Sequence, residues 1–215
     1  IAGTGGAGGT GTSGNGAAGA VLQTSGGLAL IEAAGGETPA LVNLGVTTIA
    51  ANGDLAGRIE IRTSGGGAVR MTSLAAEALG DAPPTNNDTD EAPAGIFFAA
   101  NGGTIATTGN MTLTTDSSFG AYAGSNGTIS AGGDLTIDAG DQIDIRHDVR
   151  AGIAPTIQAG GDLTATAGSI SGAPGSLLSA GGTLALTSTL GAIGVDRLNG
   201  TDILITAAGA ASVEH

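Results

Sequence analysis

Clustered carboxylates are the side chains of this sequence that could best support catalysis. Four of them fall in one short stretch: Asp138, Asp141, Asp144 and Asp148. Two carboxylates at a suitable separation can act as acid and base, or as acid and nucleophile, in hydrolysis of a glycosidic bond. Alternating carboxylates that point outward from a strand also keep a sheet soluble. We favour this second interpretation and predict no catalytic residue.

His147 is the other candidate for catalysis, within residues 142–150, QIDIRHDVR. In a strand it would share one face with Ile143, Ile145 and Val149, because side chains alternate between the two faces. A lone histidine on an apolar face is more often structural, and catalysis would need a partner that orients it. We therefore expect a chain that is not an enzyme.

A third group of carboxylates lies in residues 74–95, LAAEALGDAPPTNNDTDEAPAG. Pro83, Pro84 and Pro93 are incompatible with a regular ladder of strand hydrogen bonds, so we predict a loop excursion, which could open with a helical turn at residues 74–79. Loops on rigid scaffolds often carry recognition. The candidate partner-binding residues are Asp81, Asp88, Asp90 and Glu91. The alternative, which we favour, is a solvated insertion.

Neither a metal nor a cofactor site is predicted. Residues 88–91 lack the twelve-residue loop and the glycine spacing of calcium motifs. The glycine-rich residues 1–20 contain sequences that resemble a nucleotide fingerprint, but no strand precedes them and no helix follows. Arg58, Arg62 and Arg70 could form a positive patch for an anionic glycan. The alternative, which we favour, is a solvated face on which outward charges of opposite sign, Glu60 among them, can pair along or across coils and contribute little stability.

These residues must be positioned by a repeat that dominates the second half of the chain. TISAGGDLTIDAG at 128–140 returns as TIQAGGDLTATAG at 156–168 and as LLSAGGTLALTSTLG at 177–191. Degenerate copies occupy residues 197–209, 103–116 and 50–66. Each copy has two strand patterns that meet at a Gly-Gly or Asn-Gly corner, where we expect glycine to permit backbone angles that a side chain would block.

The spacing of these copies predicts a parallel β-helix, an all-β solenoid with short loop excursions. Repeats that start roughly 20 to 28 residues apart suit one coil of stacked short strands. Each coil buries its inner face on its neighbours, so small residues suffice inside. Roughly nine coils, at about 4.8 Å per coil, would give a rod of about 43 Å.

Composition agrees with a solenoid and excludes several classes of protein. The chain of 215 residues has 42 glycines, 2% aromatic residues and no cysteine. Its net charge of −13 should repel nucleic acid, so we expect no nucleic-acid partner. No apolar run reaches eighteen residues, so we expect no membrane insertion by a helix.

We divide the chain into five parts. Residues 1–20 are a Gly-rich lead-in or an irregular first coil, 21–73 are coils of the β-helix, 74–95 are the acidic excursion and 96–211 are further coils. Residues 212–215 are interpreted as a tail that could derive from a vector. Because the sequence opens in the middle of a pattern without methionine, we expect it to be a piece of a longer protein.

The phrases AGGDLTI at 131–137, AGGDLTA at 159–165 and AGGTLAL at 180–186 resemble the repeats of the filamentous haemagglutinin family. That family consists of exported partners of two-partner secretion. The resemblance covers residues 99–208 well and 21–71 loosely. It implies a right-handed β-helix, export through an outer-membrane secretion pore, and attachment to cells or surfaces. The family's secretion domain carries Asn-Pro-Asn motifs, which are absent here, so the resemblance indicates an interior or distal part of the stalk.

The function predicted from these features is a non-enzymatic stalk segment of a large secreted or cell-surface bacterial adhesin. Its partners would be a host or neighbouring-cell surface, presenting a glycan or a protein ligand. Two alternatives stay open: a β-helical glycan-active enzyme or tail-spike-like protein, and the delivery stalk of a contact-dependent toxin. The absence of tryptophan and lysine counts against the first, because glycan grooves use aromatic platforms and basic residues.

Overall fold

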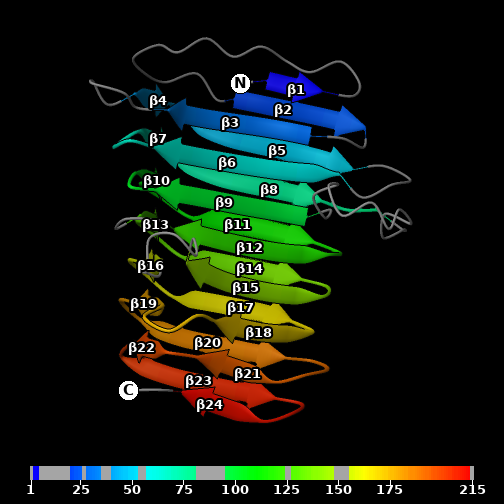
Figure 1. The fold of residues 1–215 in the computed structure, drawn as a ribbon, viewed down its shortest axis with the longest axis vertical. Helices are drawn as coiled ribbons and strands as arrows, with labels where there is room; N and C mark the ends of the chain where they lie inside the picture. The colour runs from blue at the N-terminus through cyan, green and yellow to red at the C-terminus, as the bar shows by residue number, and fades with distance from the viewer. Residues whose placement is uncertain are drawn as a thin grey trace.

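The computed structural model describes residues 2–4, 20–25, 28–34, 40–52, 57–80, 95–123, 127–147 and 155–213. All regular structure in these ranges is β-strand, and the strands stack along one long axis from the N-terminal to the C-terminal end (Figure 1). The predicted parallel β-helix is confirmed.

Three sheets run the length of the molecule. Sheet 1 consists of β2 (Ala20–Ser25), β5 (Val46–Asn52), β8 (Ser73–Ala78), β11 (Met111–Thr115), β14 (Leu135–Ala139), β17 (Leu163–Ala167), β20 (Thr183–Ser188) and β23 (Asp202–Ala207). Sheet 2 consists of β1 (Ala2–Thr4), β3 (Leu28–Ala34), β6 (Arg58–Ser64), β9 (Gly95–Asn101), β12 (Ser118–Ala123), β15 (Gln142–His147), β18 (Ser169–Gly172), β21 (Ile193–Val195) and β24 (Ala211–Val213). Sheet 3 consists of β4 (Leu41–Asn43), β7 (Ala68–Met71), β10 (Thr104–Thr107), β13 (Thr128–Ala131), β16 (Thr156–Ala159), β19 (Leu177–Ala180) and β22 (Arg197–Asn199).

Each coil passes through sheets 1, 2 and 3 in turn. The 21 strands from β2 to β22 therefore make seven coils of three strands, and β23 and β24 begin another. The sequence predicted two strands per repeat, whereas each coil has three. The two predicted strands are those of sheets 3 and 1. The strands of sheet 2 repeat least clearly in the sequence. Among the strands that the structure describes, all pairings are parallel except that β1 lies antiparallel to β3.

The core is built from columns of apolar residues in register from coil to coil. In sheet 1, Leu135 lies between Met111 and Leu163, and Leu184 follows. All four are buried. Corresponding columns of mostly isoleucine line the inner faces of the other two sheets. Each side chain is thus covered by its counterpart one coil away, which is how a solenoid dispenses with a large central core.

Both residues of the Gly-Gly corner between sheets 3 and 1 are required by close packing. A Cβ atom on the first glycine would lie within 2.3 Å of a carbonyl oxygen of the preceding coil, at Gly132, Gly160 and Gly181. A Cβ on the second would lie within 2.3 Å of a side-chain oxygen, at Gly133, Gly161 and Gly182. The positive φ angles of the described residues occur elsewhere, for example at Gly65 and Gly175. The expected explanation by backbone angle is therefore wrong for these corners.

The side chains behind the second glycines form a hydrogen-bonded ladder. The Asp134 N–H donates to Asn110 Oδ1 over 3.0 Å, and the Asp162 N–H donates to Asp134 Oδ1 over 3.0 Å. The Thr183 N–H continues the series, donating to Asp162 Oδ1 over 2.7 Å. Each side-chain oxygen thus accepts a hydrogen bond from a backbone N–H in the turn of the next coil, which has no partner in the sheets. This ladder accounts for the aspartate of the repeated Ala-Gly-Gly-Asp-Leu phrase.

The predicted excursion begins later than its first residues suggested. Leu74, Ala76 and Ala78 alternate inward along β8 and are buried, so this segment is a strand and not a helical turn. Sheet 2 resumes at Gly95, which begins β9. Residues 81–94 lie outside the described ranges. Ser212 and Val213, assigned to the tail from the sequence, belong to β24.

Candidate functional site

The four predicted partner-binding carboxylates, Asp81, Asp88, Asp90 and Glu91, all lie outside the described residues. Their role stays a prediction. In the described ranges, no group of three or more His, Cys, Asp or Glu residues is arranged to hold a metal ion.

The carboxylates considered for glycosidase chemistry do not converge. Asp138 is exposed on the outer face of sheet 1, and Asp141 is exposed at the corner before β15. Asp144 lies on the outer face of sheet 2 with only 6% of its surface exposed. Asp148 lies outside the described residues. Asp144 is therefore not the solvated carboxylate that the sequence predicted, and it accepts a hydrogen bond of 3.2 Å from Ser171 Oγ.

The three arginines considered as one patch also separate. Arg58 and Arg62 lie on β6 in sheet 2, whereas Arg70 lies on β7 in sheet 3. Glu60 stands between the first two and forms an ion pair with each, so opposite charges do pair here, but the expected solvated face is wrong at Glu60, because its carboxylate is buried. Glu60 is only 3% exposed, which makes this a buried carboxylate held between two partly exposed guanidinium groups.

An aromatic pair extends this arrangement across the next two strands. Phe97 on β9 is the register partner of Glu60 and is 5% exposed, although it faces outward. The Arg58 guanidinium carbon lies 4.0 Å from the centroid of the Phe97 ring, within cation–π range. Tyr122 on β12 stacks against Phe97, with ring centroids 6.4 Å apart and an interplanar angle of 21°. The neighbouring Phe98 points inward and contacts Phe119 edge-on, as expected for adjacent strand residues.

Gly120 is what allows the two rings to lie over the sheet. It is the register partner of Phe97 on β12. A Cβ atom here would lie 2.7 Å from Phe97 Cδ1 and 2.9 Å from Tyr122 Cε2. The rings therefore occupy the volume that any larger residue would need.

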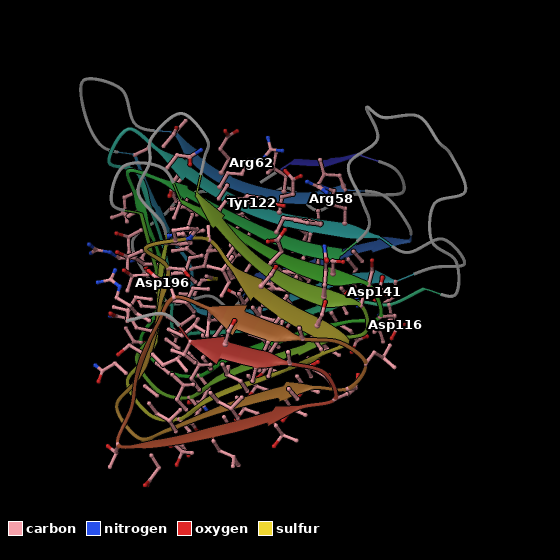
Figure 2. The ribbon with its side chains drawn as sticks, turned by 60° about the horizontal axis from the view of Figure 1, so that its bottom comes forward. Arg58, Arg62, Asp116, Tyr122, Asp141 and Asp196 are labelled. Carbon is pink, nitrogen blue, oxygen red and sulfur yellow. The ribbon has the colours of Figure 1, made fainter. Side chains whose placement is uncertain are left out.

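We call Arg58, Glu60, Arg62, Phe97 and Tyr122 the outer cluster. Figure 2 shows its labelled members, Arg58, Arg62 and Tyr122, grouped on one outer face of the rod. The alternation in RIEIR and the adjacent phenylalanines were visible in the sequence. The proximity of these two groups could not be predicted from the sequence. The insertion between β8 and β9 hides which residue of β9 lies next to Glu60 on β6.

The chemistry available to the outer cluster is recognition. Glu32 on β3 is the exposed register partner of Arg62, so two carboxylates, Glu32 and Glu60, balance the two guanidinium groups. Arg62, with its side chain 47% exposed, can donate further hydrogen bonds. Glu60 and Asp144 are separated by three strand spacings in register, about 14 Å at about 4.8 Å per strand, which is wider than a glycosidase pair requires.

A small hollow occupies the same sheet nearer the C-terminal end. It has a volume of about 170 Å³ and is lined by Gly172, Pro174, Gly194, Val195, Asp196 and Ser212. Ligand pockets usually measure about 300–1,000 Å³, so this hollow is too small for most ligands. Its rim is a tight turn in which Arg197 Nη2 donates to the Gly175 carbonyl over 2.8 Å and Asp196 accepts the Gly175 N–H.

The described residues define a parallel β-helix with three sheets. No known family model, curated protein or solved structure matches the chain. Within the described ranges, no helix is long and apolar enough to cross a membrane.

Proposed function

We propose that this chain is a non-enzymatic stalk section of a large bacterial adhesin, secreted or held at the cell surface. The observation that supports this best is the unbroken stack of coils. Sheets 1 and 3 continue in parallel register through every coil, including the coil interrupted by residues 81–94. Such a stack provides length and rigidity, with hydrogen bonds between strands directed along the rod.

The proposed route to the cell surface and the proposed partners rest on the resemblance of the Ala-Gly-Gly-Asp-Leu phrases to filamentous haemagglutinin repeats. Export would use an outer-membrane secretion pore, and the partner would be a glycan or protein on another cell. The buried state of Asp144 and the scattered positions of Asp138 and Asp141 support a non-enzymatic role, because hydrolysis needs two carboxylates on one site.

A binding assay against cells and a panel of neutral and acidic glycans tests the proposal, with glycan length scored in the same wells. The first variant carries Asp81→Asn, Asp88→Asn, Asp90→Asn and Glu91→Gln. Its matched control carries the same charge change at four exposed residues: Glu32→Gln, Asp138→Asn, Asp141→Asn and Asp202→Asn.

We expect no shortening of any glycan. Saturable binding that the first variant loses and the control keeps would identify the acidic segment as the adhesive site. Absence of binding in all three proteins would leave a spacer within the stalk. Shortened glycan chains would refute the proposal and favour the glycan-active enzyme.

A further inference from the structure

Two columns of mostly threonine run along the outer face of sheet 1, on β11, β14, β17 and β20. The first column consists of Thr112, Thr136, Thr164 and Ala185. The second, two residues further along each strand, consists of Thr114, Asp138, Thr166 and Thr187. We call the six threonines of these columns the threonine face. All four strands are paired on both sides, so the threonine face lies within the stack and away from its ends (Figure 1).

The hydroxyl groups of the threonine face are available to an external partner. Threonines at the corners use their hydroxyls internally, as Thr108 does by donating to the Thr72 carbonyl and Thr201 by donating to the Gly181 carbonyl. Within the described ranges, no such hydrogen bond involves the six hydroxyls of the threonine face, and each of these side chains is exposed or half-buried.

The threonine face is also nearly free of charge. Asp138 is the only charged residue on the four strands, in a chain that has 19 aspartates and glutamates. The surface is therefore an array of hydroxyl and methyl groups with one carboxylate in it.

The array repeats in two directions. Neighbouring members of one column are about 4.8 Å apart, and the two columns are separated by two strand residues, about 6.6 Å. Because threonine is branched at Cβ, its hydroxyl and methyl groups are held in few orientations. Sheet 3 carries no second threonine column, since Thr104, Thr128 and Thr156 lie beside a column of Ala106, Ser130 and Gln158.

We propose that the threonine face binds ice. The surface of an ice crystal presents oxygen atoms at fixed repeats in two directions, and on its prism face these repeats are similar to those of the threonine face. A hydroxyl both donates and accepts hydrogen bonds, so it can take the place of a water molecule at the crystal surface. The methyl groups leave liquid water in the same contact, which is favourable.

The periodicity of the face is what would select ice over liquid water. A single hydroxyl gains little by exchanging one water partner for another. A rigid array that matches the crystal makes all its contacts together, and linked weak contacts bind far more tightly than one alone. This inference does not depend on the proposed function, which the glycan assay tests separately.

Thermal hysteresis, the gap between the melting and freezing temperatures of an ice crystal in the protein solution, tests the proposal on the 215-residue chain. The unaltered chain should show a gap and should shape the growing crystal. Thr136→Lys, in the middle of the first column, should abolish the gap, because an ammonium group is strongly hydrated and lies on a flexible stem. Thr164→Lys repeats the test at a more exposed position of the same column.

Asp138→Thr should have the opposite effect and widen the gap. A carboxylate must lose its hydration on contact with the crystal, whereas threonine would complete the second column between Thr114 and Thr166. A gap that this variant leaves unchanged or narrows would contradict the role of the array.

Thr128→Lys is the matched control. Thr128 lies on the outer face of sheet 3, on the strand before β14, and is half-buried like Thr136. It receives the same charge change and should keep the gap, and circular dichroism should show the same strand content in every variant. Absence of a gap in the unaltered chain, a gap that survives both lysine substitutions on sheet 1, or equal loss in Thr128→Lys would each overturn the proposal. Self-association that Thr136→Lys abolishes, without any gap, would assign the face to a second copy instead.

Discussion

The second glycine of each Gly-Gly corner lies directly against the side chain that supports the turn of the next coil. A Cβ on Gly133 would lie 2.1 Å from Asn110 Oδ1, the atom that accepts the Asp134 N–H. The first glycine has a different neighbour, because a Cβ on Gly132 would lie 2.3 Å from the backbone oxygen of Thr108. A side chain can rotate away from an added methyl group, whereas the backbone of a paired strand cannot move without breaking its ladder.

This difference predicts the outcome of a double-mutant cycle. Gly133→Ala should lower the free energy of unfolding by about 1–3 kcal/mol, and Asn110→Ala by about 1 kcal/mol. The double variant should lose less than the sum, because removing the Asn110 side chain frees the space for the methyl group. Urea unfolding measures all three proteins.

Gly132→Ala is the control for this cycle. Combined with Asn110→Ala, it should show no such rescue, since the clash is with backbone. Additive losses at Gly133 would contradict our explanation of the second glycine.

At the scale of the strand, sheet 2 differs from the other two sheets because its outer face carries a packed layer of its own. Arg58 covers both Glu60 and Phe97, and Tyr122 lies over Gly120. A carboxylate that is 3% exposed has lost most of its hydration, and its two arginine partners must replace it. The outer cluster therefore ties β6 to β9 and β12 across the coil that contains residues 81–94.

Replacement of Glu60 tests how much this layer contributes. Glu60→Gln keeps the shape but leaves two neighbouring guanidinium groups without their carboxylate, and should cost about 1–3 kcal/mol of unfolding free energy. Asp138→Asn makes the same charge change at an exposed position on β14 and should stay within about 0.5 kcal/mol of the parent chain. Thermal or urea unfolding gives both values. Equal effects of the two substitutions would show that the outer cluster does not stabilise the sheet.

The part of the fold that the sequence predicted is the part that repeats. The phrases at 128–140 and 156–168 place equivalent residues in register, and the structure pairs Ile129 with Ile157 and Leu135 with Leu163. The outer cluster could not be predicted in this way. Glu60 and Phe97 are register partners although 37 residues separate them (97 − 60), and no periodicity indicates how many residues the insertion adds. The candidate carboxylates at 81, 88, 90 and 91 lie in that same insertion.

At the scale of the whole molecule, the stack behaves as a series of equivalent coils, which predicts that a coil can be removed. Deleting residues 135–162 joins Asp134 directly to Leu163. Because Leu163 is the register partner of Leu135, which follows Asp134 in the parent chain, the junction restores the sequence Ala-Gly-Gly-Asp-Leu-Thr. This chain should fold with the strand content of the parent and be shorter by one coil, about 4.8 Å. Small-angle X-ray scattering and circular dichroism measure the two quantities.

A deletion shorter by one residue provides the control. Removing residues 137–163 places Thr164 directly after Thr136, which turns Thr164 and Thr166 inward and Ala165 outward. This protein should unfold at a much lower temperature than the in-register deletion. If the two deletions were equally stable, the coil would not be the structural unit of this chain.

The excursion between β8 and β9 shows that the length of the rod does not depend on how many residues each coil contains. Leu74 and Met111 are register partners 37 residues apart (111 − 74), whereas Leu184 and Ile203 are partners only 19 residues apart (203 − 184). Both intervals advance the rod by the same step, because the step is fixed by hydrogen bonds between strands and not by the number of residues in the coil. A foreign peptide or an entire folded domain can therefore be inserted at the corner after Ala78. It would be presented at a fixed position along the rod, and the distance between coils would stay unchanged.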